Sequence, residues 1–293
     1  MYPRPIEHYF APTELAQALE LLGRFGARAR LLSGGQSLMT QLKAREIDTD
    51  CLIDLNRIPG LSTIEEQDGE LVIGAMVRHA ELLADPLIAR RCPILADAAD
   101  CIGDPQVRNR GTIGGSLAFA DILTDLPVAV SALDARIVAV KDGGGNRSIG
   151  IGDFFLGPRR TALAADELLS EIRIAAPGPG SGGAYCKQAP MVNGFAIVCV
   201  AVQLQIDAGA NCRQAAIVVG GLASMPRRAS AAMRHLLGRT LSTQHIKEVA
   251  VVAAQEIEVV TDFRASADYR SNLIGHYVET LIHRAVNRAG HAP

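Results

Sequence analysis

Two glycine pairs, each followed by hydroxyl side chains, are the residues in this sequence best suited to bind a ligand. The first lies in the segment 34–37, Gly-Gly-Gln-Ser, and the second in 112–116, Thr-Ile-Gly-Gly-Ser. Glycine leaves the backbone uncovered, so that successive N–H groups can converge on a phosphate oxygen. A Gly-Gly pair also marks ordinary tight turns. Two such loops in adjoining lobes, however, could hold a pyrophosphate from two sides.

The elements around the first loop suit an anion site. Residues 12–25 have the apolar spacing of an amphipathic helix, and 29–33 read as a short buried strand. A helical stretch follows at 38–45 and another strand at 51–55. This order predicts a small α/β lobe. The glycine pair would stand between a strand and a helix N-terminus, whose dipole favours an anion.

A second lobe is predicted from about residue 57. Its elements, in chain order, are a strand at 71–74, helical sequence over 78–100 broken at Asp85-Pro86, a hairpin around 143–145 and a strand at 168–175. The segment 102–116 is polar and glycine-rich. We interpret it as a long loop, and loops of this length inside a compact domain are usually functional.

The third region follows the segment 177–183, PGPGSGG, which we interpret as a linker. This segment also matches G-x-G-x-x-G. A dinucleotide-binding motif should close a strand and open a helix, whereas this one contains two prolines and leads into strand-like sequence. Strand-like runs at 195–206 and 213–222 then precede three helical stretches. Strands followed by helices predict an α+β unit.

Composition and charge argue against several classes of protein. The chain has 293 residues, enough for two or three domains, and its 48% hydrophobic content is not that of a disordered chain. A net charge of −2 gives no attraction to nucleic acid, and no apolar run reaches the ~18 residues of a membrane span. The low charge, 20% of residues, fits either an alanine-rich globule or a subunit with buried faces.

Cysteine spacing and the N-terminal sequence set further expectations. The six cysteines form no C-x-x-C, so we expect no metal or iron–sulfur site held by this chain alone. The N-terminal residues resemble neither a signal nor a transit peptide, which favours the cytoplasm. The sequence contains no triad-like nucleophile motif and no H-E-x-x-H, and we name no catalytic residue.

Several motifs in one order resemble the FAD-binding subunits of the molybdenum hydroxylases. Segments 32–38 and 103–116 resemble the two flavin-binding signatures of that family. The segments 153–161 (DFFLGPRRT), 166–169 (DELL) and 184–187 (AYCK) also fit. The resemblance is to the medium subunit of carbon monoxide dehydrogenase and the FAD domain of xanthine dehydrogenase. It covers essentially the whole chain.

The resemblance implies an α+β protein with a two-lobed FAD-binding domain of the vanillyl-alcohol oxidase/p-cresol methylhydroxylase type. The lobes would be 1–56 and 57–176, with a linker at 177–183. Residues 184–293 would form a C-terminal domain of the carbon monoxide dehydrogenase flavoprotein type, with an antiparallel sheet and helices.

The resemblance also implies FAD as the cofactor of an electron-transfer subunit. Molybdopterin would be carried by a large partner subunit and [2Fe–2S] clusters by a small one, in a dimer of heterotrimers. Electrons would pass from the clusters through FAD to an external acceptor. The substrate would bind to another chain, so this sequence identifies neither the substrate nor the electron acceptor.

By resemblance, particular residues would contact FAD. The pyrophosphate would lie against 33–37 and 112–116, and Asp125 would contact the ribityl region. The whole expected set is Ser33, Gly34, Gly35, Gln36, Ser37, Leu38, Ile102, Thr112, Ile113, Gly114, Gly115, Ser116, Asp125, Leu169 and Lys187. Phe195 falls where relatives carry an aromatic residue near the flavin ring.

Each assignment outside the two loops has a purely structural alternative. Asp125 could be only a helix N-cap. Ile102 and Leu169 could be core residues, and Lys187 could be a solvated residue on a strand. Phe195 could belong to the core or stack on the flavin.

Two other classes of function also stay open. One is a self-sufficient FAD-dependent oxidoreductase, although no domain is left to hold its substrate. The other is a binding module that has lost its flavin, against which the intact glycine pairs argue. The sequence departs from the family at Met191, where relatives often have a basic residue four places after the lysine. The role of the loop Pro190–Asn193 therefore stays undetermined.

Overall fold

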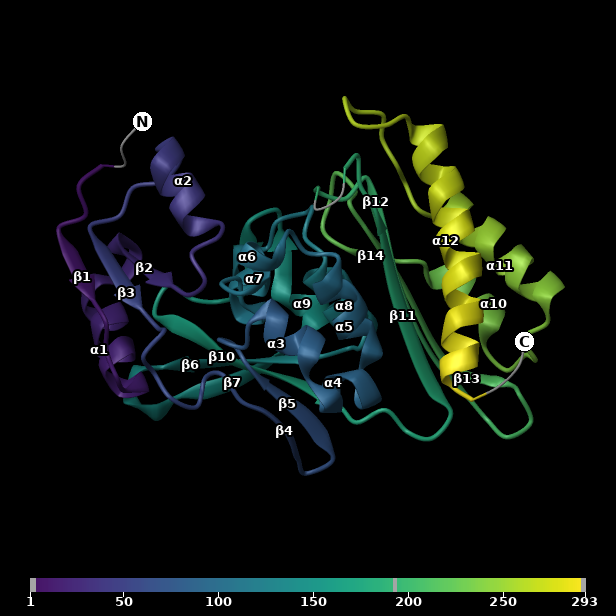
Figure 1. The fold of residues 1–293 in the computed structure, drawn as a ribbon, viewed down its shortest axis with the longest axis horizontal. Coiled ribbons are helices and arrows are strands. Elements are labelled where there is room, and N and C mark those ends of the chain that lie inside the picture. Colours follow the sequence, from purple (N-terminus) through teal and green to yellow (C-terminus); the bar gives the residue numbers. More distant parts are fainter. Residues whose placement is uncertain (1–3, 192–193, 291–293) are drawn as a thin grey trace.

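Three structural units follow one another along the long axis of the molecule (Figure 1). The computed structural model describes residues 4–191 and 194–290. An N-terminal lobe lies at one end, a central lobe follows, and the C-terminal domain lies at the other end. None of the described helices is both long and apolar enough to span a membrane.

The N-terminal lobe is a three-stranded parallel sheet with two helices. Its strands lie in the order β1 (His8–Phe10), β3 (Cys51–Asp54), β2 (Ala29–Leu32), and its helices are α1 (Leu15–Phe25) and α2 (Leu38–Ala44). Parallel neighbours need a crossover, and α2 provides the one between β2 and β3. The predicted order of helix, strand, glycine loop, helix and strand is confirmed.

The central lobe is a five-stranded antiparallel sheet packed against several short helices. Its strands lie in the order β4 (Ile64–Gln67), β5 (Glu70–Gly74), β10 (Glu167–Ala175), β6 (Arg136–Lys141), β7 (Asn146–Gly150). The helices are α3 (His79–Ala84), α4 (Pro86–Arg91), α5 (Pro93–Asp100), α6 (Pro105–Arg108), α7 (Ile113–Phe119), α8 (Leu126–Ala132) and α9 (Ile151–Phe154). The small hairpin of β8 (Phe155–Gly157) and β9 (Arg160–Thr161) completes the lobe.

Prolines divide the helical sequence over 78–100. Pro86 begins α4, as predicted, and Pro93 begins α5, a second break that the sequence reading missed. Proline suits a first helical turn because its missing N–H is unneeded there. The expectation of one long loop over 102–116 is wrong, because α6 and the start of α7 lie inside it.

The C-terminal domain is a four-stranded antiparallel sheet covered by helices, as expected. The strands are β11 (Ser181–Gln188), β12 (Val198–Ile206), β13 (Cys212–Gly220) and β14 (Arg227–Arg228), followed by α10 (Ser230–Leu236), α11 (Thr243–Glu256) and α12 (Ala267–Arg288). Along β12, Val198 and Val200 belong to the core beneath the helices, whereas Cys199 and Ala201 belong to the core of the central lobe. Burial on both faces explains the unbroken apolar run.

The connection before this domain is shorter than the predicted linker. β11 begins at Ser181, so the last three residues of 177–183 are already in the sheet. A Cβ on Gly182 would stand 2.0 Å from the carbonyl oxygen of Ala285 in α12. Gly182 therefore lets β11 and α12 approach each other closely. It does not serve as a flexible joint in a linker.

Candidate functional site

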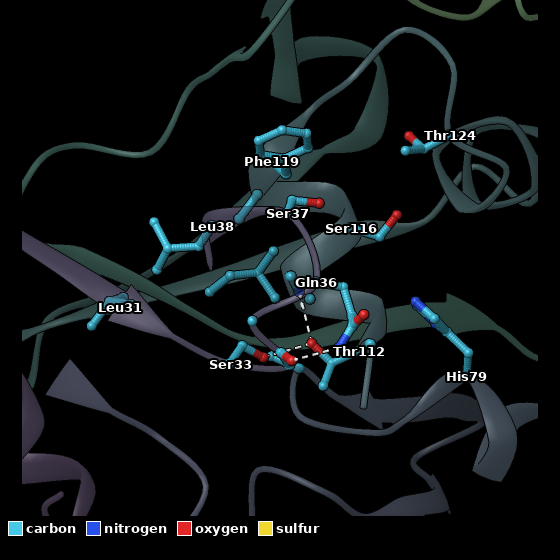
Figure 2. A pocket seen from close by; sticks show the side chains of 18 of the residues that line it. Leu31, Ser33, Gln36, Ser37, Leu38, His79, Thr112, Ser116, Phe119 and Thr124 are labelled. Carbon is cyan, nitrogen blue, oxygen red and sulfur yellow. Dashed lines mark hydrogen bonds between the residues drawn. The ribbon is translucent and has the colours of Figure 1, made fainter. Parts of the chain in front are cut away.

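A cavity of about 790 Å³ lies where the two lobes and the C-terminal domain meet. Its wall includes the loop between β2 and α2, the start of α7 and residues of β10 and β11. Figure 2 shows Ser33, Gln36 and Ser37 of one lobe near Thr112 and Ser116 of the other. Every residue of the expected set lines this cavity except Ile113, which is fully buried in the core of the central lobe.

The first glycine loop offers a row of backbone N–H groups. Within the described part of the chain, the N–H groups of residues 34–38 donate to no acceptor. The first hydrogen bonds at the start of α2 are those from Met39 N to Gly35 O and from Gln41 N to Ser37 O. Gly35 has φ +73°, a left-handed conformation that favours glycine. Successive unpaired amides of this kind form a concave site for an anion.

The second glycine loop is bonded differently. Ile113 N donates to Val77 O and Gly114 N to Ala75 O, while Gly115 N donates to the Thr112 hydroxyl. Ser116 N donates to Thr112 O. The prediction that both glycine pairs present free N–H groups is therefore wrong for this pair. This loop instead lines the cavity with its two glycines and with the hydroxyl-bearing side chains of Thr112 and Ser116.

The two loops touch each other at the floor of the cavity. Ser33 Oγ and Thr112 Oγ1 are 2.6 Å apart, a hydrogen bond drawn in Figure 2. A Cβ on Gly34 would stand 2.1 Å from the carbonyl oxygen of Arg110. The first pair of glycines thus belongs both to the row of unpaired amides and to the contact between the lobes.

A buried ion pair forms another part of the wall. Asp125, 5% exposed, accepts hydrogen bonds from Tyr185 Oη at 2.6 Å and from Lys187 Nζ at 3.1 Å. Lys187 Nζ also donates to Cys101 O at 2.6 Å. Burial raises the pKa of Asp125, which the Lys187 charge opposes. Asp125 stands at the N-cap position of α8, but its side chain accepts no capping hydrogen bond from that helix. Lys187 is 7% exposed, so the alternative of a solvated lysine is wrong.

The other expected contacts lie at different depths. Leu169 packs in the core of the central lobe and also lines the cavity. Ile102 is half-buried, packs against the same core and lines the cavity as well. Phe195 lines the cavity with 64% of its surface exposed, which excludes a core role. Met191 is 70% exposed, and the neighbouring residues 192–193 lie outside the described residues.

His79 is a cavity residue that the sequence reading missed. It is 5% exposed, and its Nδ1 is buried without a hydrogen-bond partner in the described chain. Burial, reinforced by the charge of Arg108, lowers the pKa of His79 to about 4. In Figure 2 its ring reaches toward Thr112 and Ser116. Nothing in the local sequence distinguishes this histidine from one at any helix start.

Arg159 is a second cavity residue that was missed. Its guanidinium lies 3.4 Å from Glu46 of the N-terminal lobe and 3.4 Å from Asp121 of the central lobe. It also lies 5.2 Å from the centre of the Phe119 ring. Arg159 belongs to the segment 153–161, DFFLGPRRT, so its membership of a family motif could have indicated this position from the sequence.

These features fit an extended dinucleotide. A cofactor pocket typically has 300–1,000 Å³, about the size of this cavity. The unpaired amides of 34–38 suit a pyrophosphate, and the buried Asp125–Lys187 pair supplies polar groups elsewhere along the wall. Among the described residues, no group of three or more His, Cys, Asp or Glu is placed to hold a metal ion.

Comparison with known proteins supports the same conclusion. The family model described as the FAD binding domain in molybdopterin dehydrogenase matches residues 4–177. The CO dehydrogenase flavoprotein C-terminal domain matches residues 184–285. The carbon monoxide dehydrogenase medium chain of Hydrogenophaga pseudoflava is 36% identical over 97% of each chain. The 6-hydroxypseudooxynicotine dehydrogenase complex subunit alpha of Paenarthrobacter nicotinovorans is also 36% identical, over 97% of this chain and 96% of that one.

Solved structures have the same fold. Carbon monoxide dehydrogenase of Hydrogenophaga pseudoflava, in a form that lacks the Mo-pyranopterin moiety of the molybdenum cofactor, matches with a TM-score of 0.91 and 37% identity over 98% of this chain and 99% of that one. Quinoline 2-oxidoreductase of Pseudomonas putida 86 matches with a TM-score of 0.91 and 30% identity, over 99% of both chains. The chain therefore belongs to the molybdenum hydroxylase family as an FAD-binding medium subunit, the electron-transfer flavoprotein of an oxidoreductase complex.

Proposed function

We propose that this chain binds FAD with the pyrophosphate on the amides of residues 34–38, and that it passes electrons from the [2Fe–2S] clusters of a small partner subunit to an external acceptor. The observation that carries the proposal is the row of amides that donate to no acceptor within the described residues and line the cavity, because successive free backbone N–H groups form a concave site for an anion. Molybdopterin would be carried by a large partner subunit.

When bound, the flavin supplies the redox chemistry, and the protein contributes binding, orientation and electrostatics. The amides of 34–38 would neutralise part of the pyrophosphate charge, with hydroxyls of Thr112 and Ser116 close by. Asp125, Lys187, Ile102 and Leu169 would line the remainder of the FAD site. No residue of this chain needs to move a proton on a substrate.

The assembly and location are further parts of the proposal. Relatives named as medium chains or as subunits of complexes support a multi-subunit enzyme, and we propose a dimer of heterotrimers. All six cysteines are free thiols, which suits the reducing cytoplasm. Analytical ultracentrifugation of the purified complex tests the stoichiometry, and cell fractionation tests the location.

Co-expression with the adjacent genes tests the central assignment. We expect the chain to purify with a molybdopterin subunit and an iron–sulfur subunit, with flavin absorbance near ~450 nm and about one FAD per chain. A chain that purifies without flavin would refute the FAD site. Substrate turnover by the isolated chain would instead support a self-sufficient FAD-dependent oxidoreductase.

A further inference from the structure

A series of polar contacts links α12, the last helix, to the wall of the cavity described above. In α12, Arg288 Nη1 lies 2.6 Å from Asp97 Oδ2, and Arg284 Nη2 lies 3.2 Å from Asp97 Oδ1. Asp97, on α5 of the central lobe, also accepts a hydrogen bond from the backbone N–H of Tyr185 at 3.1 Å. Strand β11 is therefore held against the central lobe at Tyr185.

The Tyr185 side chain continues this chain of contacts into the wall of the cavity. It is 1% exposed, and its Oη donates to Asp125 Oδ1 at 2.6 Å. Lys187 Nζ donates to the other oxygen, Oδ2, at 3.1 Å. Tyr185 and Lys187 are two residues apart on β11, so their side chains point to the same face of the sheet. One strand thus supplies a separate donor to each oxygen of one buried carboxylate.

We propose that Tyr185 is a positioning residue of the flavin site, which holds Asp125 ionised and in a single orientation beside Lys187. The proposal depends on the proposed function, because it assumes that FAD occupies the cavity. Tyr185 is absent from the residues that line the cavity, so it acts through Asp125.

Lys187 alone would leave Asp125 only partly satisfied. Burial favours the neutral carboxyl group, and a buried ion pair is stable only when further hydrogen bonds satisfy the remaining lone pairs. Tyr185 can donate only while its hydroxyl keeps its proton. Burial and the Asp125 charge raise its pKa well above the usual value, so it stays a donor at all ordinary pH values.

The other titratable groups around Asp125 do not compete for this role. Among the described residues, the thiols of Cys101 and Cys199 also interact electrostatically with Asp125, and the Cys199 thiol is in addition a hydrogen-bond neighbour of the Tyr185 hydroxyl. Burial raises their pKa values to about 11 and about 12, so both stay neutral near pH 7. Removing the Tyr185 hydroxyl would therefore favour protonation of Asp125 and leave the positive charge of Lys187 uncompensated in the wall.

The test is Tyr185→Phe in the purified complex, with FAD content, flavin absorbance and FAD midpoint potential measured against pH. A hydrogen bond to a charged group of typical strength implies that the proton affinity of Asp125 rises about 10- to 100-fold. Protonation of Asp125 beside the flavin should appear as a step in the pH dependence of the absorbance and of the midpoint potential. In Tyr185→Phe the midpoint of this step should lie about one to two pH units higher than in the wild type. Tyr277→Phe is the matched control, because Tyr277 Oη donates to Gln188 Oε1 at 2.9 Å in the same domain. It should leave the step in place.

Asp125→Asn completes the test and covers the case in which Tyr185→Phe does not fold. If Asp125 is the titrating group, this variant should lose the pH step, and adding Tyr185→Phe to it should produce no further shift. The proposal is overturned if Tyr185→Phe retains FAD with an unmoved step, or if the step survives in Asp125→Asn. A wild-type complex without FAD would refute the proposed function instead.

Discussion

The contact between the two glycine loops predicts a severe effect of a single methyl group at Gly34. A Cβ there would stand 2.1 Å from Arg110 O and 2.7 Å from the Cα of Gly111. Both are backbone atoms, and ordinary contact begins at 3.4 Å, so the loops must separate by about 1 Å. Overpacking of this kind costs about 1–3 kcal/mol. If that cost falls on the FAD-bound arrangement of the loops, the Kd for FAD should rise about five- to 150-fold.

Titration of the FAD-free protein with FAD, followed by quenching of flavin fluorescence, would measure this Kd for Gly34→Ala. Gly23→Ala is the control, because a Cβ at Gly23 in α1 meets no atom within 4 Å. That variant should gain about 0.5–1 kcal/mol of stability from helix propensity and keep its FAD affinity. Gly34→Ala with the wild-type Kd and an unchanged Tm would refute the inference that this contact shapes the FAD site.

Three other side chains give separate tests. The pKa of His79 is about 4 in the folded state against 6.5 ordinarily, so the unfolded chain binds the extra proton between these values. Stability should therefore fall by about 3 kcal/mol as the pH drops from 6.5 to 4, and urea denaturation of His79→Gln should lose this part of the pH dependence. Lys187→Met leaves Asp125 buried without its cation and should cost about 3–5 kcal/mol at pH 7; a urea midpoint equal to that of the wild type would contradict the ion pair. Phe195→Ala, at an exposed position, should change stability by less than about 0.5 kcal/mol but alter the fluorescence of bound FAD, and unaltered fluorescence would exclude a flavin contact.

The order of elements and one half of the site could be predicted from the sequence, because both depend on local patterns. The helical and strand periodicities placed the 34–37 loop between β2 and α2, and the structure confirms that setting. For the loop at 112–116, the free or bonded state of the amides depends on the carbonyl groups of Ala75 and Val77, far away in the chain. A glycine pattern carries no information about such partners.

The remaining site residues depend on tertiary packing in the same way. His79 lines the cavity only because α3 packs beside Gly111, and a single helix-initiating histidine gives no sign of this. Tyr185 reaches Asp125 because β11 lies against α5, while α8, which Asp125 precedes, lies against the neighbouring strands β12 and β13. Gly182 and Gly183 had the appearance of linker residues because a glycine pattern does not show the close neighbours, such as Ala285 beside Gly182, which follows about one hundred residues later.

A crystal structure of this chain with bound FAD would decide where the cofactor lies. We expect the pyrophosphate oxygens to accept hydrogen bonds from the backbone N–H groups of residues 34–38, and the flavin to lie in the same cavity as Lys187 and Asp125. A pyrophosphate held by arginine side chains, with the amides of 34–38 still unbonded, would contradict the site proposed for this protein.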